Sequence, residues 1–536
     1  MMVAKRTVQL TPCRQVILIL AGAVTGALVV VFSVAVLDPP RLGVREGRAV
    51  VSRVPAPCGR GDGRGCTPAS HVTDPKNGLR PEWQPPKGGY CYKHGGDWSQ
   101  CAAPHRLYPA STPAELRARP GPMCLHEPYC WMQLDWQSAD PPTWQCGSTQ
   151  SLLFWQMSFH TSAASDSVAL LEQGLGVHTA HICGAKSADF LAKIYNYSFT
   201  QCAMANKQAF DTSWKVKASS KLRDANVQYL HETHQFEEVD ALLFSFSASM
   251  WENYMSVADE KVLVLSLWHR MNMFRCSPEE ARDNIRAAQS LASTRAKRPH
   301  ILGPQTLYDV EYMRHYTGIN PIFLPTTLID AIGVRGRRMW NETRKSFLWN
   351  AHRGVPSELM SLAETSGHAY TGAPKNYAME DLALYAGVVY LPYSVTNGKV
   401  VEQYAMSIPL FVPSVEFAMA LEMFDDRTMD RPYCSNTNDF FKDLTDPGTP
   451  YEHSPNADIR RSSSEAAGQR FWIGFADIYH WPCIVQFNSW DHLNTLLTET
   501  DRMAVSQCMW QANKWRHFEA KQNWCWATAQ IASGRT

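Results

Sequence analysis

The middle of the chain repeats a strand–helix unit, and this repetition restricts the possible folds more than any other feature. Strand-like runs at 347–350, 368–371 and 388–391, and a last one entered through Ile408-Pro409, alternate with helix-like segments at 356–365 and 377–385 and an amphipathic segment containing Glu402. Strands that alternate with helices form a parallel sheet, since each helix returns the chain to the start of the next strand. We therefore predict a doubly wound α/β domain over residues 326–415.

A second series of the same kind precedes it. Residues 240–250 and 261–270 are apolar runs that end in polar residues, and helix-like segments follow at 277–296 and 305–316. Ser277-Pro278-Glu279-Glu280 has the cap, first-turn proline and acidic first turn of a helix start. These patterns predict another α/β domain over residues 151–325, and the proline-containing stretch 321–327 marks the crossing between the two domains.

The loop within residues 388–413 is suited to binding an anion. It carries Asn397, Gly398 and Lys399 between an apolar run and the segment containing Glu402. Loops at the carboxyl ends of parallel strands hold ligands, and a helix that starts there offers unpaired N–H groups to a diphosphate. The sequence therefore predicts a site for a phosphate-bearing ligand.

The N-terminal region contains one long apolar segment. Residues 16–37 are uncharged and follow Lys5, Arg6 and Arg14. A bilayer requires about 20 apolar residues, whereas the apolar region of a cleaved signal peptide usually has about 7–15. We predict a cytoplasmic tail over 1–15 and a transmembrane anchor over 16–37, with a cleaved signal peptide as the alternative.

Cysteine usage indicates an oxidising compartment. Of the 15 cysteines, seven lie in a Pro-, Gly- and Trp-rich region with little periodicity: Cys58, Cys66, Cys91, Cys101, Cys124, Cys130 and Cys146. Such a region keeps its shape through disulfides, and the paired C-x-x-C motifs typical of zinc sites are missing. Asn196 and Asn341 begin glycosylation sequons. We expect a single-pass type II protein of the Golgi or ER membrane, with its bulk in the lumen.

The remaining segments complete the domain organisation. We predict a stalk over 38–80, a Cys/Trp-rich cap over 81–150, an exposed insertion over 416–470 and closing elements over 471–536. The cap is interpreted as a disulfide-stapled cover, with an aromatic sugar-binding surface as the alternative. Lys and Arg number 51 against 50 Asp and Glu, so the net charge of +1 does not favour nucleic acid as a partner.

A resemblance adds to this reading. The stretch from Lys399 to Met406, followed by the strand entered through Ile408-Pro409, resembles the donor-binding segment of GT-B-fold glycosyltransferases. Val400, Glu402 and Tyr404 match the V-x-E-x-aromatic run of the α1,3-fucosyltransferases. In that family a lysine follows the glutamate, whereas Gln403 stands here. The L-P-Y-x-V and S-I-P-L-F-V-P-S strings are also similar to a group of animal and algal membrane proteins, which implies no defined reaction.

The resemblance implies a GT-B-like architecture and a nucleotide-sugar substrate. Two Rossmann-like domains would follow the anchor and the cap, and the enzyme would move a sugar from a UDP- or GDP-linked donor to a glycan or glycoprotein acceptor, without a cofactor. Glu402 would bind the ribose, and Arg353 would bind the diphosphate from one side. Asn397, Gly398 and Lys399 would bind it from the other.

Residues for the chemical step are expected in the first domain. An inverting transfer needs a base at a strand end facing the cleft, and His269 and Glu252 are the candidates, with Asp240 behind them. The sequence contains no Asp-x-Asp, the carboxylate pair with which GT-A transferases grip a metal and a diphosphate. We therefore expect a metal-independent reaction.

The sequence lacks the motifs characteristic of two other enzyme classes. A lumenal sulfotransferase would need a G-x-x-x-x-G-K-[ST] loop and a serine hydrolase a G-x-S-x-G turn, and the sequence contains neither. The main alternative is a GT-B-derived domain that has lost catalysis and serves as a membrane-tethered binding or scaffold protein. Gln403 and the unassigned base keep this alternative open.

Overall fold

The chain forms two compact units, residues 1–70 and 71–536, which are described separately. The computed structural model describes residues 7–10, 15–18, 20–24, 27–31, 114, 121–147, 152–156, 161–182, 202–203, 228, 235–245, 251–268, 278–293, 296–335, 337–351, 356–365, 367–368, 370–372, 377–423 and 472–534.

The N-terminal unit contains strands where the sequence predicts a membrane-spanning helix. β1 (Thr7–Leu10) pairs with β2 (Gln15–Leu18), and β3 (Leu20–Val24) pairs with β4 (Ala27–Val31), both antiparallel. Residues 16–37 are rich in valine, a β-branched residue that favours strands, and they include glycines that weaken a helix. Within the described residues, no helix is both long enough and apolar enough to cross a membrane.

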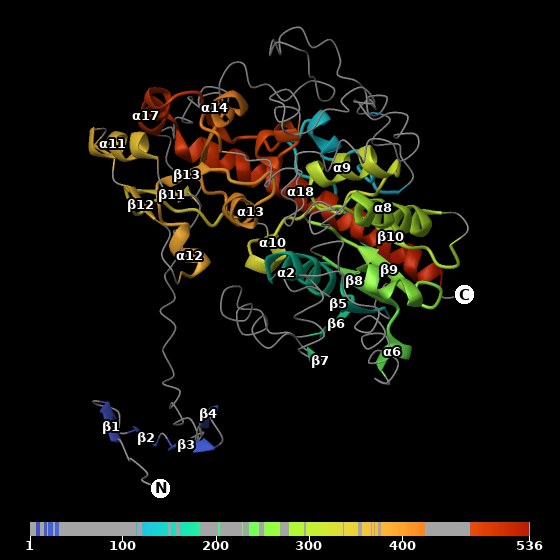
Figure 1. Cartoon of the computed structure of the whole chain (residues 1–536). Helices are drawn as coiled ribbons and strands as arrows, with labels where there is room; N and C mark the ends of the chain where they lie inside the picture. Colours follow the sequence, from blue (N-terminus) through green and yellow to red (C-terminus); the bar gives the residue numbers. More distant parts are fainter. Residues whose placement is uncertain are drawn as a thin grey trace, which may run out of the picture. The chain divides into compact units, whose positions relative to one another are not determined.

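The first α/β domain is built on a parallel sheet of six strands (Figure 1). These strands are β5 (Leu153–Gln156), β6 (His178–Ile182), β7 (Cys202–Ala203), β8 (Ala241–Phe244), β9 (Val262–Leu265) and β10 (Ile301–Leu302). Their spatial order is β10-β9-β8-β5-β6-β7. When the strands are counted along the chain this is 6-5-4-1-2-3, the order of a doubly wound dinucleotide-binding fold read from the opposite edge.

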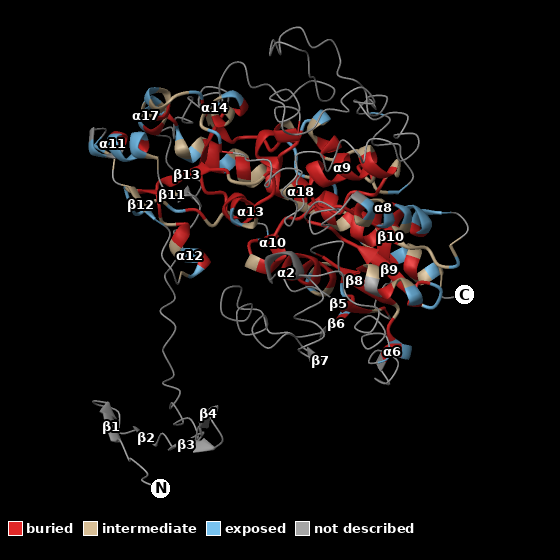
Figure 2. Cartoon of the chain, in the orientation of Figure 1, coloured by how far each residue is buried: buried red, intermediate tan, exposed pale blue. Residues whose placement is uncertain are grey.

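Both faces of this sheet are covered, which explains its apolar strands. Leu242 and Phe244 of β8 face the large core that contains Ile285 of α8, whereas Ala241 and Leu243 face a second core with Leu170 and Trp524. Strands buried on both faces are continuously apolar rather than alternating. Figure 2 shows these strands as buried and the outer side of α8 as exposed.

The two helices that the sequence predicts in the first domain are present. α8 (Pro278–Ala292) falls within the predicted segment 277–296, and α9 (Leu307–Thr317) ends one residue beyond the predicted segment 305–316. The other elements are α2 (Thr161–Ala169), the π-helix η4 (Leu170–Gly174), α6 (Gln235–Glu238), the 3₁₀ helix η5 (Glu252–Val257) and α10 (Ile329–Ile332).

The second domain contains a parallel sheet of five strands in the order β12-β11-β13-β14-β15. These are β11 (Phe347–Ala351), β12 (Tyr370–Gly372), β13 (Gly387–Leu391), β14 (Leu410–Pro413) and β15 (Val485–Phe487). Counted along the chain, the order is 2-1-3-4-5, the other common doubly wound arrangement. The α/β prediction is therefore confirmed. The fifth strand comes from the C-terminal region, which the sequence patterns indicate only as closing elements.

The helices of this domain follow the predicted alternation. α11 (Ser357–Thr365), α12 (Met379–Leu382) and α13 (Gly398–Ala405) connect the strands, and α14 (Val415–Ala420) follows β14. α17 (Trp490–Glu499) follows β15. Residues 424–471, most of the predicted insertion, lie outside the described residues, as do the stalk over 38–80 and residues 81–113 of the cap.

The longest helix among the described residues, α18 (Arg502–Ser533), joins the two sheets. Its 32 residues span about 48 Å at about 1.5 Å per residue. Asn513 donates to the carbonyl of Tyr404 in α13 at 2.7 Å, and Trp524 packs in the second core of the first domain. In Figure 1 the helix runs behind both domains. The sequence patterns do not predict it at this length.

The stretch between the domains is held in place by α18. Asn523 donates to the carbonyl of Phe323 at 2.7 Å, and Arg516 donates to that of Thr326 at 3.0 Å. Asp166 of α2 accepts from the backbone N–H groups of Thr327 and Leu328 at 2.9 and 2.5 Å. The crossing at 321–327 is therefore buried, and hydrogen bonds from α18 and α2 hold it in place.

The described part of the cap, residues 121–147, packs on α18. It contains the 3₁₀ helix η3 (Cys130–Gln133), and the Trp131 indole stacks on that of Trp515 with centroids 6.3 Å apart. Disulfides join Cys124 to Cys130, Cys146 to Cys525 and Cys483 to Cys508. The disulfide prediction is thereby confirmed for this part of the chain.

Candidate functional site

The strand order of the second sheet reverses between β11 and β13, and the carboxyl edge at this point is the candidate crevice. From β11 the chain moves to β12 on one side, and from β13 it continues to β14 and β15 on the other. Ligands of open α/β sheets bind where the order reverses, outside the carboxyl ends of the strands. Ala351 and Leu391, the last residues of the two strands, lie opposite each other in the register.

α13 begins directly after this crevice. Residues 392–396 lead from β13 to Asn397, whose side-chain oxygen accepts from the backbone N–H of Lys399 at 2.9 Å. Asparagine is favoured at this N-cap position because it pairs one of the unsatisfied first-turn N–H groups. The remaining first-turn N–H groups and the positive end of the helix dipole are suited to an anion. The predicted strand, loop, helix and strand are all present.

Glu402 lies within α13 and is largely buried, with 7% of its surface exposed. Burial, followed by the charge of Glu402, raises the pKa of Tyr377 to about 12. Tyr377 precedes α12 and follows β12, the strand beside β11. The charge of Glu402 therefore acts on Tyr377, a residue that follows β12.

Of the two predicted diphosphate-binding cations, Lys399 is among the described residues and Arg353 is not. Lys399 is exposed on the first turn of α13. Arg353 lies outside the described residues, although β11 ends two positions before it, at the crevice. Gln403, where the fucosyltransferases have lysine, is buried at 3% exposure, and its amide oxygen accepts no hydrogen bond in the described part of the chain.

A group of tyrosines lines the same edge, and the sequence patterns did not single it out. Burial raises the pKa of Tyr390 well above its usual value, the nearby Tyr393 and Tyr479 hydroxyls add to this, and the Asn397 side chain acts in the opposite direction. Tyr479 also donates to the carbonyl of Pro413, the last residue of β14, at 3.2 Å. Tyrosines after apolar strands are common in cores, so the sequence offered no signal that distinguished these.

The carboxyl edge of the first sheet carries a second set of buried polar side chains. Gln156 ends β5, and its amide nitrogen donates to Ser245, which follows β8. Gln305, after β10, donates to Ser266, after β9, at 2.7 Å. β5 and β8 are the neighbours at which this sheet's strand order reverses. The sequence patterns did not predict these residues, since single amides and serines carry no motif.

The candidate bases of the first domain differ in their positions in the structure. His269 lies outside the described residues. Glu252 begins η5, on the connection from β8 to β9, and is partly exposed. Asp240 is at the wrong end of the sheet: it precedes β8 and accepts from the backbone N–H of Leu153, at the start of β5, at 2.7 Å. A residue at the amino ends of the strands cannot act at the carboxyl edge, so Asp240 is not a base.

The glycosylation sequons and the question of a metal site concern other parts of the chain. Asn341 is exposed, as glycosylation would require, whereas Asn196 lies outside the described residues. Among the described residues, no group of three or more His, Cys, Asp or Glu side chains is placed to hold a metal ion.

The fold defines an α/β protein with two parallel sheets, and the strand order of the second reverses between β11 and β13. No family model matches this chain, and no curated protein has a significantly similar sequence.

Proposed function

We propose that the protein is a nucleotide-sugar-dependent glycosyltransferase of GT-B-like architecture that binds its donor at the β11–β13 crevice. The observation that carries the proposal is the position of the buried Glu402 in α13, the helix that begins at this crevice. A carboxylate can accept hydrogen bonds from both ribose hydroxyls, and the first turn of the helix can bind the diphosphate.

Charge stabilisation of the leaving nucleotide is the chemistry that this arrangement supports. The diphosphate gains negative charge as the glycosidic bond breaks, and fixed cations and N–H donors stabilise that charge. Lys399 supplies a cation on the first turn of α13, and Arg353 would supply a bidentate one from the chain after β11. The acceptor hydroxyl would lose its proton to Glu252 or His269 in the first domain, without a metal.

The lumen of the Golgi or ER remains the proposed location, with membrane attachment through the apolar residues 16–37. Disulfides of the described part support an oxidising compartment, including Cys146–Cys525. A glycan or glycoprotein acceptor would be found in the same compartment.

A nucleotide screen on the full-length protein tests the proposal. We expect one of UDP, GDP or CMP, or its sugar conjugate, to raise Tm, because a ligand at about 100 times its Kd stabilises the native state by about 2.7 kcal/mol. Glu402→Gln should weaken this shift, and Glu364→Gln, at an exposed position near the end of α11, is the matched control. The absence of a shift with every nucleotide would contradict the proposal.

Turnover separates the enzyme from the inactive alternative. A transferase should release free nucleotide from the stabilising donor in the presence of acceptor, or slowly with water. Binding without release in either case would favour the membrane-tethered binding protein.

A further inference from the structure

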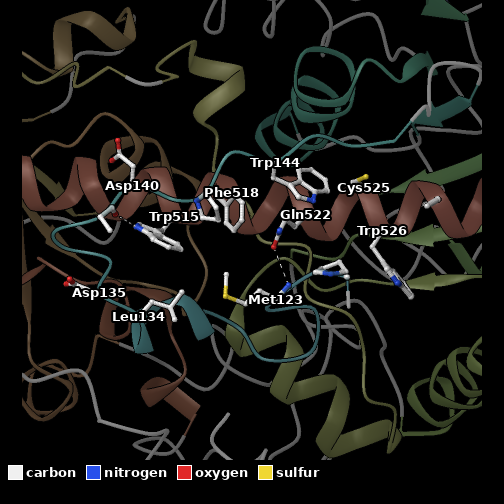
Figure 3. Close-up of a pocket in the computed structure, with 15 residues that line it drawn as sticks. Met123, Leu134, Asp135, Asp140, Trp144, Trp515, Phe518, Gln522, Cys525 and Trp526 are labelled. Carbon is white, nitrogen blue, oxygen red and sulfur yellow. Dashed lines mark hydrogen bonds between the residues drawn. The ribbon is translucent and has the colours of Figure 1, made fainter. Parts of the chain in front are cut away.

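A pocket of about 700 Å³ lies between the cap and one side of α18, apart from the residues of the donor crevice (Figure 3). Its α18 wall includes Trp515, Phe518, Gln522 and Trp526, and its cap wall includes Asp135 and Trp144. The volume is within the range of about 300–1,000 Å³ that is typical of small-molecule sites.

The pocket is elongated along the helix. Trp515, Phe518, Gln522 and Trp526 are spaced at three or four residues and therefore share one face of α18. From Trp515 to Trp526 the helix rises by about 16 Å at about 1.5 Å per residue. Figure 3 shows these side chains distributed along the helix rather than gathered at one point. A ligand made of several linked units fits such a shape.

The two walls are covalently joined. Cys525, which lines the pocket, forms the disulfide with Cys146 of the cap. Met123 of the cap also donates its backbone N–H to the Gln522 side-chain oxygen at 3.3 Å. The pocket is therefore held open by the fold before any ligand binds, which lowers the entropic cost of binding.

Aromatic surface remains available inside it. Trp144 and Trp526 are only partly buried where they pack against the core of the first domain. The face of an indole ring is apolar and electron-rich, and it packs well against the C–H groups on one face of a sugar ring. Two such rings at separate positions suit successive sugar units.

The polar groups of the pocket are suited to hydrogen bonds with hydroxyl groups of a ligand. Gln522 is 8% exposed, its oxygen is engaged by Met123, and its amide nitrogen donates no hydrogen bond to the described residues. That nitrogen offers a donor, and the exposed Asp135 carboxylate offers an acceptor. A hydroxyl group satisfies both kinds of partner, whereas an acyl chain satisfies neither. Lys or Arg is not among the lining residues, which disfavours an anionic ligand.

We propose that this pocket binds a neutral oligosaccharide. Trp144 and Trp526 form stacking surfaces for its sugar rings, and Gln522 and Asp135 hydrogen-bond its hydroxyl groups. The site goes beyond the proposed transfer reaction because it uses the cap and α18 rather than the donor crevice. Its binding can be measured without any nucleotide.

Calorimetric titration of the full-length protein tests the proposal. The probes are cellotriose, chitotriose and mannotriose, and we expect at least one to bind. Trp526→Ala should weaken that binding by about tenfold or more, a difference of about 1.4 kcal/mol, and Trp526→Phe should retain most of it. Gln522→Glu keeps the oxygen that accepts from Met123 and removes the N–H donor, so binding should again weaken.

Controls separate a local effect from a fold defect. Gln507→Glu adds the same charge at an exposed position of α18 outside the pocket and should leave the affinity unchanged. Each variant should show the far-ultraviolet circular dichroism of the unchanged protein. Tetramethylammonium and decanoate are tested as a cationic and an acyl-chain ligand. The proposal is overturned if no trisaccharide binds, if only one of these two compounds binds, or if Trp526→Ala binds the trisaccharide as tightly as the unchanged protein.

Discussion

At the scale of single residues, the end of α13, opposite the site, shows how local strain is tolerated. Ser407 has a φ of 60°. Its N–H bonds to the carbonyl of Tyr404, and that of Ile408 bonds to the carbonyl of Gln403, which is the Schellman arrangement usually found with glycine. α18 adds a hydrogen bond from Ser506 to the Ser407 carbonyl at 2.7 Å. The strained turn is therefore fixed by its surroundings.

Ser407→Gly should stabilise the protein. Glycine adopts positive φ without steric cost, and we expect the free energy of unfolding to rise by about 0.5–1 kcal/mol, since part of the gain is offset by the greater freedom of glycine in the unfolded chain. Urea denaturation measures the change. Ser407→Ala keeps the Cβ atom and should give no gain; equal stabilisation by both variants would refute the explanation.

Lys399→Ala should weaken nucleotide diphosphate binding about tenfold and reduce the dependence of that binding on salt. The reason is that the variant removes an exposed ammonium group from the first turn of α13. Titration of the stabilising nucleotide at low and high salt measures both effects. Lys345→Ala removes another exposed lysine, one paired with Glu342, and should change neither. An unchanged affinity in Lys399→Ala would remove this residue from the donor site.

At the scale of elements, α18 donates hydrogen bonds to backbone carbonyl groups at the end of α13. Asn513 donates to the carbonyls of Tyr404 and Ala405 at the end of α13, and its own oxygen accepts from Arg516 at 2.8 Å. Arg516 in turn lies over the Trp481 ring at 4.0 Å. These buried contacts orient α13 against α18 and thereby help to position Glu402.

Asn513→Leu should destabilise the protein strongly. The change leaves the buried Ala405 carbonyl and one Arg516 donor without their Asn513 partner. Each such group costs about 1–3 kcal/mol. We expect a loss of about 2 kcal/mol or more in urea denaturation. Gln507→Leu, on the exposed side of the same helix, should change stability by less than about 0.5 kcal/mol. Similar losses in both variants would show that helix packing in general, rather than these hydrogen bonds, is responsible.

Asp477, in the 3₁₀ helix η6 (Asp477–Tyr479), should make stability depend on pH. Burial is the largest effect and raises the pKa of this carboxyl to about 6, against opposing hydrogen bonds from Tyr129 and Leu307 and the charge of Arg516. The folded state therefore holds the proton more tightly than the unfolded chain. This contribution to stability is complete below a pH of about 4 and is lost as the pH rises to about 6.

Asp477→Asn isolates this contribution. Both hydrogen bonds from Tyr129 and Leu307 end on the same oxygen of Asp477, which asparagine retains. Relative to the unchanged protein, the variant should become more stable between pH 4 and pH 7, by up to about 3 kcal/mol. Denaturation at the two pH values gives the difference. A difference that does not vary with pH would show that Asp477 does not titrate in this range.

At the scale of the whole molecule, the cap and the C-terminus are tied together across most of the chain. Cys146 and Cys525 are separated by 379 residues, whereas Cys124 and Cys130 are separated by six. In the chain-entropy account, a disulfide stabilises more when it closes a longer loop in the unfolded state. The long-range bond also fixes α18 against the cap.

Replacing Cys146 and Cys525 together by serine should cost about 2–5 kcal/mol, more than the same change at Cys124 and Cys130. Thermal denaturation of the two double variants and the unchanged protein gives the comparison. The reverse order would mean that local packing around Cys124 and Cys130 outweighs chain entropy.

The sequence by itself determined the local elements. Periodicity and helix-start residues gave α8, α9, α11 and the elements from β11 to β14, because these patterns depend on which faces are buried within a short stretch. The same reasoning placed Asn397, Lys399 and Glu402 on one loop and helix. For residues 16–37 hydrophobicity predicts a membrane anchor, whereas part of this stretch forms β3 and β4.

Only the tertiary structure decided how distant segments combine. The strand orders, the fifth strand from Val485–Phe487 and the 32-residue α18 follow from contacts between residues far apart in the chain. Gln156 and Gln305 both lie at the carboxyl edge of the first sheet, and Asp240 lies at its amino edge, for the same reason. Periodicity records only that a face is buried, whereas the partner that buries it is chosen by packing across the whole fold.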